Sequence, residues 1–187
     1  MHDHFVPNLR PTLIGSLPMD DHSAATRLIF DSVPEIPLWA QLPAFREEGM
    51  VAQFLPGFPG AGRPAGKNRI DAADSGFADE VVAFYEDYLA VTGDPSHLEK
   101  SRFALGEDTA RGFFEFIRQA PSLSAGCFAV KGQITGPFTF ATSLVDSGDR
   151  AVFYDDQLRD MAVKLIALFT HDISPPDQKD DENISCK

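Results

Sequence analysis

Three short apolar runs, each closed by a glycine or a proline, constrain this chain most. They span residues 12–16, 37–42 and about 128–134. Runs of this length are typical of strands that are buried on both faces of a parallel sheet. Segments with helical spacing separate them, and a helix is the usual crossover between parallel strands. The pattern therefore predicts an α/β fold in which the three runs are neighbouring parallel strands, with helices on their outer side.

Apolar residues at helical spacing predict the intervening helices. The expected helices run from about 23 to 32, from 77 to 89, from 107 to 119 and from 150 to 169, with a short one around 45–54. The last of these has the clearest stripe, formed by Leu158, Met161, Ala162, Leu165, Ile166 and Phe169. Residues 55–68 hold four glycines and three prolines, which predicts a flexible surface loop.

The balance of charge excludes two kinds of partner. The 187 residues carry a formal net charge of −12, whereas nucleic acids and anionic membrane surfaces attract basic clusters. The first residues show neither the basic nor the apolar part of a signal peptide. Two cysteines are too few for a disulfide framework, which favours a reducing compartment. We therefore expect a cytoplasmic protein.

The end of the chain differs in composition from the rest. Residues 171–187 are polar, acidic and broken by proline, so they cannot bury enough apolar surface to offset the entropy of ordering. We expect a domain over residues 1–170 and a disordered acidic tail over 171–187. Three strands are too few for a closed (β/α)₈ barrel, which needs about 250 residues. The domain is thus either a small α/β domain or an incomplete barrel.

Candidate binding residues lie at the ends of two runs, because ligands of parallel α/β sheets bind beyond the carboxyl ends of the strands. The first run delivers Ile14, Gly15 and Ser16 to that edge, and the third delivers the stretch from Lys131 to Pro137. A lysine and a glutamine in an apolar strand need partners if they are buried. The alternative is that the glycines only permit turns and that Lys131 faces solvent.

The residues at these two ends resemble a known superfamily. Residues 12–18, Thr-Leu-Ile-Gly-Ser-Leu-Pro, resemble the Ile-Gly-Ser-Phe-Pro signature of the C-terminal barrel of cobalamin-independent methionine synthase. Residues 131–139, Lys-Gly-Gln-Ile-Thr-Gly-Pro-Phe-Thr, resemble the Gly-x-x-Thr-Gly-Pro segment of the same superfamily, which includes uroporphyrinogen decarboxylase. The resemblance covers residues 8 to 169 and is greatest to the methionine synthase II-like proteins.

The resemblance implies a fold, a chemistry and a set of site residues. The fold is the N-terminal half of a TIM barrel, and the chemistry is methyl transfer from folate or cobamide to a zinc-activated thiol such as homocysteine. Substrate contacts carry over to two short segments and to one residue near the end of the second run. They are Ile14, Gly15, Ser16, Gln41, Thr135, Gly136 and Pro137. Ser16 and Thr135 should then line one mouth.

The chain also departs from that superfamily. The His-x-Cys pair and the other zinc ligands belong to the second half of the barrel, beyond the matching part of this chain. Gln41 and Pro43 lie where methionine synthase has the glutamate that holds the substrate amine. We therefore expect a truncated barrel that binds no zinc and is inactive alone, although its full-length relatives use zinc, a thiol and a methyl donor. His171 and Cys186 lack a second pair of ligands at zinc spacing.

Two alternatives stay open at this point. One is a tetrapyrrole decarboxylase of the same superfamily. The sequence has no arginine pair near the first strand end, which is evidence against this alternative. The other is a non-catalytic α/β interaction module. An open half-barrel leaves sheet edges unpaired, so a second copy of the chain could associate with them.

Overall fold

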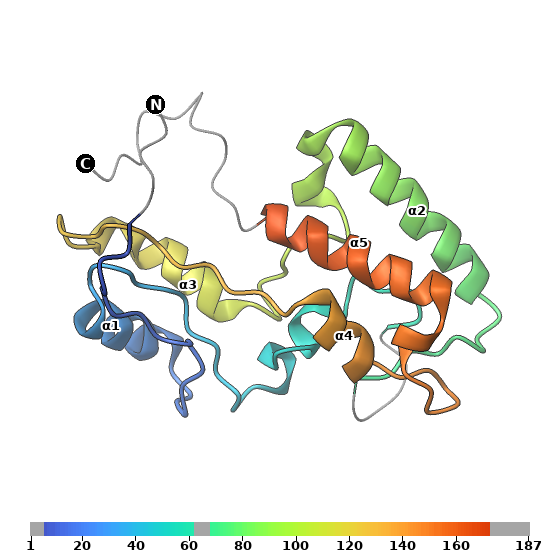
Figure 1. Ribbon diagram of the computed structural model, residues 1–187, viewed down its shortest axis with the longest axis horizontal. Helices are drawn as coiled ribbons and strands as arrows, with labels where there is room; N and C mark the ends of the chain where they lie inside the picture. Colours follow the sequence, from blue (N-terminus) through green and yellow to red (C-terminus); the bar gives the residue numbers. More distant parts are fainter. Residues whose placement is uncertain (1–5, 62–67, 173–187) are drawn as a thin grey trace. The chain divides into compact units, whose positions relative to one another are not determined.

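The computed structural model describes residues 6–61 and 68–172 of the chain (Figure 1). Five α-helices and five short 3₁₀ helices are found there. The α-helices are α1 His22–Ser32, α2 Phe77–Gly93, α3 Arg111–Gln119, α4 Pro137–Ser143 and α5 Asp156–Asp172. The 3₁₀ helices are η1 Arg46–Glu48, η2 Ala52–Phe54, η3 Pro95–Lys100, η4 Ala120–Ser122 and η5 Val152–Tyr154. None of the helices in the described part is long and apolar enough to cross a membrane.

The chain forms two compact units. Unit 1 combines the described residues up to Phe45 with Arg111–Gln133, and unit 2 combines Arg46–Ala110 with the described residues from Ile134 onward. Each unit therefore takes two separate stretches of sequence. The expected single domain over residues 1–170 did not include this division, and the expected tail lies almost wholly outside the described residues.

The predicted α/β partial TIM barrel is wrong. Helices make up 48% of the structure and β-bridges only 4%, and the described residues form no sheet. Two backbone features prevent a ladder. Gly15 has a φ of 100°, which interrupts the extended conformation of the first run, and Pro37 has no N–H to donate in the second. In the third run, the N–H groups of Phe128 and Ala129 both reach the Glu35 carbonyl, which no regular ladder allows.

The three runs nevertheless lie side by side within unit 1. Ser16 forms an isolated parallel bridge with Gln41, and Leu38 forms one with Lys131. The run 37–42 is therefore in the middle, between 12–16 and 128–134. The prediction that the three runs are parallel neighbours is confirmed, whereas the prediction that they are strands of a sheet is wrong.

Helix α1 begins one residue before the expected Ser23. The side chain of Asp21 accepts a hydrogen bond from the Ala24 N–H at 2.9 Å, which caps the helix, and the helix ends at Ser32, two residues before Pro34. Ala25 and Ile29 of its predicted apolar face are buried with Leu38 and other residues of the middle run. Leu28 and Ser32, which the spacing places on the same face, are exposed, so the helix covers the aligned runs through only part of its predicted face.

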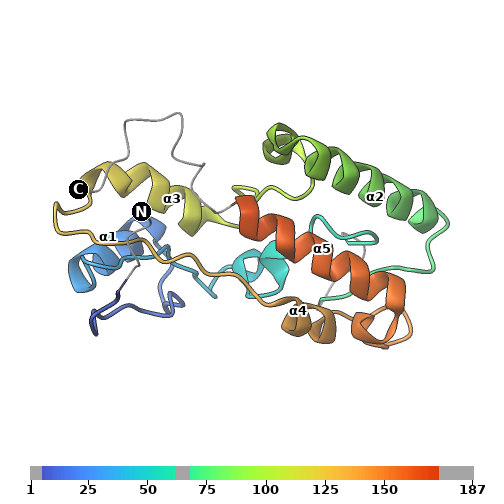
Figure 2. The same cartoon turned by 45° about the horizontal axis from the view of Figure 1, so that its top comes forward.

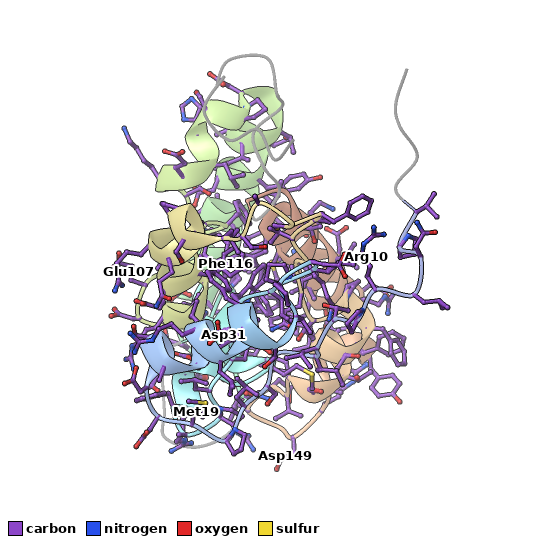
Figure 3. All side chains as sticks on the ribbon, turned by 90° about the vertical axis from the view of Figure 1, so that its left-hand side faces the viewer. Arg10, Met19, Asp31, Glu107, Phe116 and Asp149 are labelled. Atoms are coloured by element: carbon purple, nitrogen blue, oxygen red, sulfur yellow. The ribbon has the colours of Figure 1, made fainter. Side chains whose placement is uncertain are left out.

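Helix α3 packs on α1 through a face that the sequence did not predict. Its buried residues are Gly112, Glu115 and Phe116. The helical spacing instead predicts a face of Ala110, Phe113, Phe114 and Ile117, and of these Ile117 is 52% exposed. Phe116 meets Phe30 of α1 edge to face, with ring centroids 5.3 Å apart (Figure 3). Gly112 faces the Ala40 carbonyl so closely that a Cβ would overlap its oxygen. Without a side chain at this position the helix backbone can lie directly on the middle run.

Unit 2 is built around α5. The stripe that predicted this helix is buried, and α5 lies beside α4 and α2 (Figure 2). Aromatic contacts join it to distant parts of the sequence, because Phe169 packs against Phe54 of η2 at 5.3 Å. Tyr85 of α2 donates a hydrogen bond to Asp160 of α5 at 2.8 Å.

The glycine-rich loop is packed into unit 2 over the part that the structure describes. Phe58 is 2% exposed and its ring lies 5.9 Å from that of Phe140. Gly60 has a φ of 74° and donates its N–H to a Glu80 carboxylate oxygen at 2.7 Å. Residues 57–60 are therefore buried in unit 2, although Pro56 beside them is exposed, which differs from the surface loop that their composition predicted. Residues 62–67 lie outside the described part.

Candidate functional site

The end of the first run is held against its neighbours by Gly15. A Cβ at Gly15 would lie 2.5 Å from Nε2 of Gln133 and 2.9 Å from Cδ1 of Leu38, and its φ of 100° suits glycine. The backbone of Gln41 fixes the same place, since it donates to the Gly15 carbonyl at 2.8 Å and accepts from the Leu17 N–H at 3.0 Å. Gly15, Ser16 and Gln41 of the predicted site are therefore brought together in unit 1.

The two polar side chains of the third run serve this arrangement. Lys131 Nζ donates to the Leu13 carbonyl at 2.6 Å, and Gln133 Nε2 donates to the Trp39 carbonyl at 3.4 Å. Each bond links the third run to one of the other two. Lys131 and Gln133 thus have the partners that their apolar surroundings require, and both act in holding the runs together.

A hollow opens directly beyond the ends of these runs. Its volume is about 680 Å³, and it is open to solvent on a wide side. Seven residues of unit 1 line it: Ser16, Leu17, Pro18, Met19, Asp20, Pro43 and Ala44. Figure 3 shows Met19 in the segment that precedes α1. The wall combines one hydroxyl and one carboxylate with an otherwise apolar surface.

The charge at this hollow is negative. Asp20 is exposed and no basic residue lines the wall. The next residue, Asp21, holds its charge on the N-terminus of α1, where the hydrogen bond from the Ala24 N–H lowers the pKa of the carboxyl group. Two neighbouring carboxylates on an acidic chain favour a ligand with a positive group.

The other predicted site residues have different surroundings. Ile14 is 81% exposed and lines no part of the hollow. Thr135 is buried in unit 2, where its hydroxyl donates to the Met50 carbonyl. Gly136 and Pro137 start α4, with Pro137 in the first turn, where its missing N–H costs nothing. Because Ser16 and Thr135 belong to different units, the prediction that both line one mouth stays a prediction.

The zinc chemistry that the resemblance implied does not fit the residues described. No group of three or more His, Cys, Asp or Glu side chains that could hold a metal occurs among residues 6–61 and 68–172. Cys127 is buried and its Sγ lies 3.7 Å from the Ala129 carbonyl oxygen. The ring of His22 stacks on Phe45 at 5.0 Å. We therefore propose no role for zinc in the described part of this chain.

Sequence reasoning missed Asp20, Met19 and Ala44. The available signal was a pair of prolines, since Pro18 and Pro43 each follow an apolar run at a similar distance. Prolines at both positions stop the runs from pairing further and turn the chain away, which leaves a hollow between the two turns.

No family model, curated protein or solved structure matches this chain. The expectation of a TIM barrel is corrected, since the described structure is mostly helical without a sheet, and family evidence for a methyltransferase or for zinc is lacking. The superfamily resemblance therefore rests on the motifs at residues 12–18 and 131–139.

Proposed function

We propose that unit 1 binds a small molecule with a protonated amine in the hollow beyond Ser16. The observation that carries the proposal is the position of the hollow, directly past the point where Gln41 fastens Gly15 and Leu17. Asp20 would hold the amine, and the hydroxyl and N–H of Ser16 would meet a polar group of the ligand. Leu17, Met19 and Pro43 offer apolar contact to its body.

The motif at residues 12–18 suggests the class of ligand. In the superfamily that it resembles, this segment contacts the amino-acid part of a thiol substrate. An amino-acid thiol has the amine that Asp20 favours and a short apolar stem. L-homocysteine is therefore the probe that we choose, and the proposal concerns binding without catalysis.

Titration of the ¹⁵N-labelled whole chain with L-homocysteine, under reducing conditions and followed at the amide signals of Ser16, Leu17 and Ala44, tests this function. N-acetyl-L-homocysteine is the comparison ligand because it lacks the positive charge. We expect saturable binding of L-homocysteine, and binding about two- to fivefold weaker for the acetylated compound and for Asp20→Asn, as for an exposed ion pair. Asp31→Asn on α1 is the matched control, because Asp31 is an exposed carboxylate that does not line the hollow. Equal affinity of Asp20→Asn and Asp31→Asn would contradict the role of Asp20.

Self-association of unit 1 is a second candidate, favoured by exposed apolar side chains on both outer runs. Ile14 is 81% exposed and Val130 is 47% exposed. A second copy could cover them, against the mutual repulsion of two chains with a net charge of −12. Sedimentation equilibrium should then show a dimer that is stronger at high salt and weaker in Ile14→Ser. A monomer at all salt concentrations would exclude this candidate.

A further inference from the structure

Unit 2 has a hollow of its own, which no sequence motif marks. Its volume is about 430 Å³. The lining residues all belong to unit 2 and are Gln53, Pro56, Gly57, Arg102, Ala104, Gly106, Asp108, Thr109 and Phe169. The size lies within the range of small-molecule pockets, which is about 300–1,000 Å³.

Gln53 is the feature that points to a ligand. It is 4% exposed, yet its side-chain Nε2 is buried without a hydrogen-bond partner in the described structure. A buried donor without a partner is rare because its desolvation is not compensated. Gln53 is also one of the residues that line the hollow. A ligand oxygen there would supply the missing partner.

Arg102 is another residue of the same wall, and its guanidinium is held by two contacts. Its Nε donates to a carboxylate oxygen of Asp87 at 2.6 Å, and its guanidinium carbon lies 5.8 Å from the centre of the Phe84 ring. The ion pair occupies Nε and leaves the two terminal nitrogens for a ligand. A guanidinium fork of this kind recognises carboxylates.

The wall beside Arg102 is tightly built. A Cβ at Gly57 would overlap the Arg102 carbonyl oxygen and lie 2.9 Å from Cδ1 of Leu165. The loop can lie against the Arg102 backbone only because residue 57 is glycine. Phe169, which is 2% exposed, and Pro56 add apolar surface.

Asp108 brings the opposite charge to the hollow. It lies in the turn after Gly106, which is closed by hydrogen bonds from the N–H groups of Thr109 and Ala110 to the Gly106 carbonyl at 3.1 and 2.9 Å. Asp108 and Thr109 are both among the residues that line the hollow. A single anion or cation would meet one like charge here, whereas a molecule with both charges would meet a partner for each.

We propose that this hollow in unit 2 binds a small zwitterion of the amino-acid type. Arg102 and Gln53 hold its carboxylate, Asp108 holds its ammonium group, and Phe169 and Pro56 contact its side chain. The proposal does not depend on the hollow of unit 1, because the residues of the two hollows do not overlap.

The test is a titration of the whole chain, labelled with ¹⁵N, with L-leucine as the probe. Two analogues each lack one charge: isoamylamine has no carboxylate and 4-methylpentanoate has no amine. We expect saturable shifts of the Gly57 and Gly106 amide signals with L-leucine. Binding should be about tenfold weaker for isoamylamine and about two- to fivefold weaker for 4-methylpentanoate, which loses only the contact with the exposed Asp108. Failure of L-leucine to bind, or equal binding of either analogue, would overturn the proposal.

Three variants locate the contacts. Asp108→Asn should weaken L-leucine about two- to fivefold, because Asp108 is exposed, and should leave 4-methylpentanoate unchanged, since that analogue has no ammonium group. Gln53→Met keeps the size of the side chain and removes the unpaired donor. It should weaken the binding of L-leucine and of 4-methylpentanoate, which both carry a carboxylate. Asp79→Asn on α2 is the matched control, an exposed carboxylate away from the hollow. If Asp108→Asn and Gln53→Met bind L-leucine as Asp79→Asn does, the assignment is wrong.

Discussion

The close approach of α3 to the middle run predicts that Gly112→Ala disrupts unit 1. A Cβ at this position would overlap the Ala40 carbonyl oxygen and lie 2.9 Å from the carbonyl carbon, whereas ordinary contacts begin at 3.4 Å. Both obstacles are backbone atoms, so α3 or the run must move. Overpacking costs about 1–3 kcal/mol, and the better helix propensity of alanine returns at most about 1 kcal/mol. We expect a net loss of about 1–2 kcal/mol in the free energy of unfolding.

Trp39 makes this loss measurable in unit 1 alone. It is the single tryptophan of the chain, it is 4% exposed, and its ring meets Phe113 of α3 at 5.2 Å. Urea unfolding followed by Trp39 fluorescence should show a lower midpoint for Gly112→Ala and a red-shifted native emission. Gly93→Ala on α2 of unit 2 is the control, because a Cβ at Gly93 meets nothing within 4 Å and the change lies outside unit 1, so the Trp39 midpoint should stay unchanged. A Gly112→Ala midpoint equal to that of the control would refute the close packing.

Three further changes follow from single contacts. Thr26 is fully buried with an unpaired hydroxyl, so Thr26→Val should raise the free energy of unfolding by about 1 kcal/mol in the same urea experiment. Gly57→Ala should lower the free energy of unfolding of unit 2 by about 2 kcal/mol, because its Cβ would overlap the Arg102 carbonyl oxygen. The loss of the native amide signal of Phe169 during urea denaturation measures this change. Burial first, and then the hydrogen bond to Asp160, raise the pKa of Tyr85 to about 12 from 10.0, so the folded state favours the neutral phenol. This stabilisation is complete below pH 10 and is lost as the pH rises to about 12. The loss in the free energy of unfolding is at most about 1 kcal/mol, because the group is partly exposed. Tyr85→Phe should remove this alkaline loss in unfolding curves recorded over a series of pH values.

The helices were the predictable part of the fold. The stripe of α5 was found because its residues all face one core, and the cap of α1 was missed by two residues because Asp21 caps the helix in place of Ser23. The face of α3 was wrong for a physical reason. Gly112 adds no apolar surface to a periodicity count, yet its small size decides which side of the helix can approach the middle run.

The sheet could not be predicted correctly from apolar runs alone. The runs do align in parallel, but ladder formation depends on the φ of Gly15 and on which N–H groups find a carbonyl. The return of residues 111–133 to the N-terminal part of the chain is likewise a long-range pairing that local pattern does not encode.

The candidate site was predictable where the backbone changes direction. The Gly-Ser end of the first run marked Ser16, and the hollow begins there. The other hollow was missed because its chemistry comes from three distant segments. Gln53 looked like one position of a short helix, and Arg102 and Asp108 followed no pattern.

Amide shift mapping of the ¹⁵N-labelled chain during addition of L-homocysteine tests the proposed function most directly. The account predicts saturable shifts at Ser16, Leu17, Met19, Asp20 and Ala44, which line the hollow of unit 1, and smaller shifts of these signals in Asp20→Asn. Shifts that are absent from these residues, or that appear only at Gly57 and Gly106 in unit 2, would contradict it.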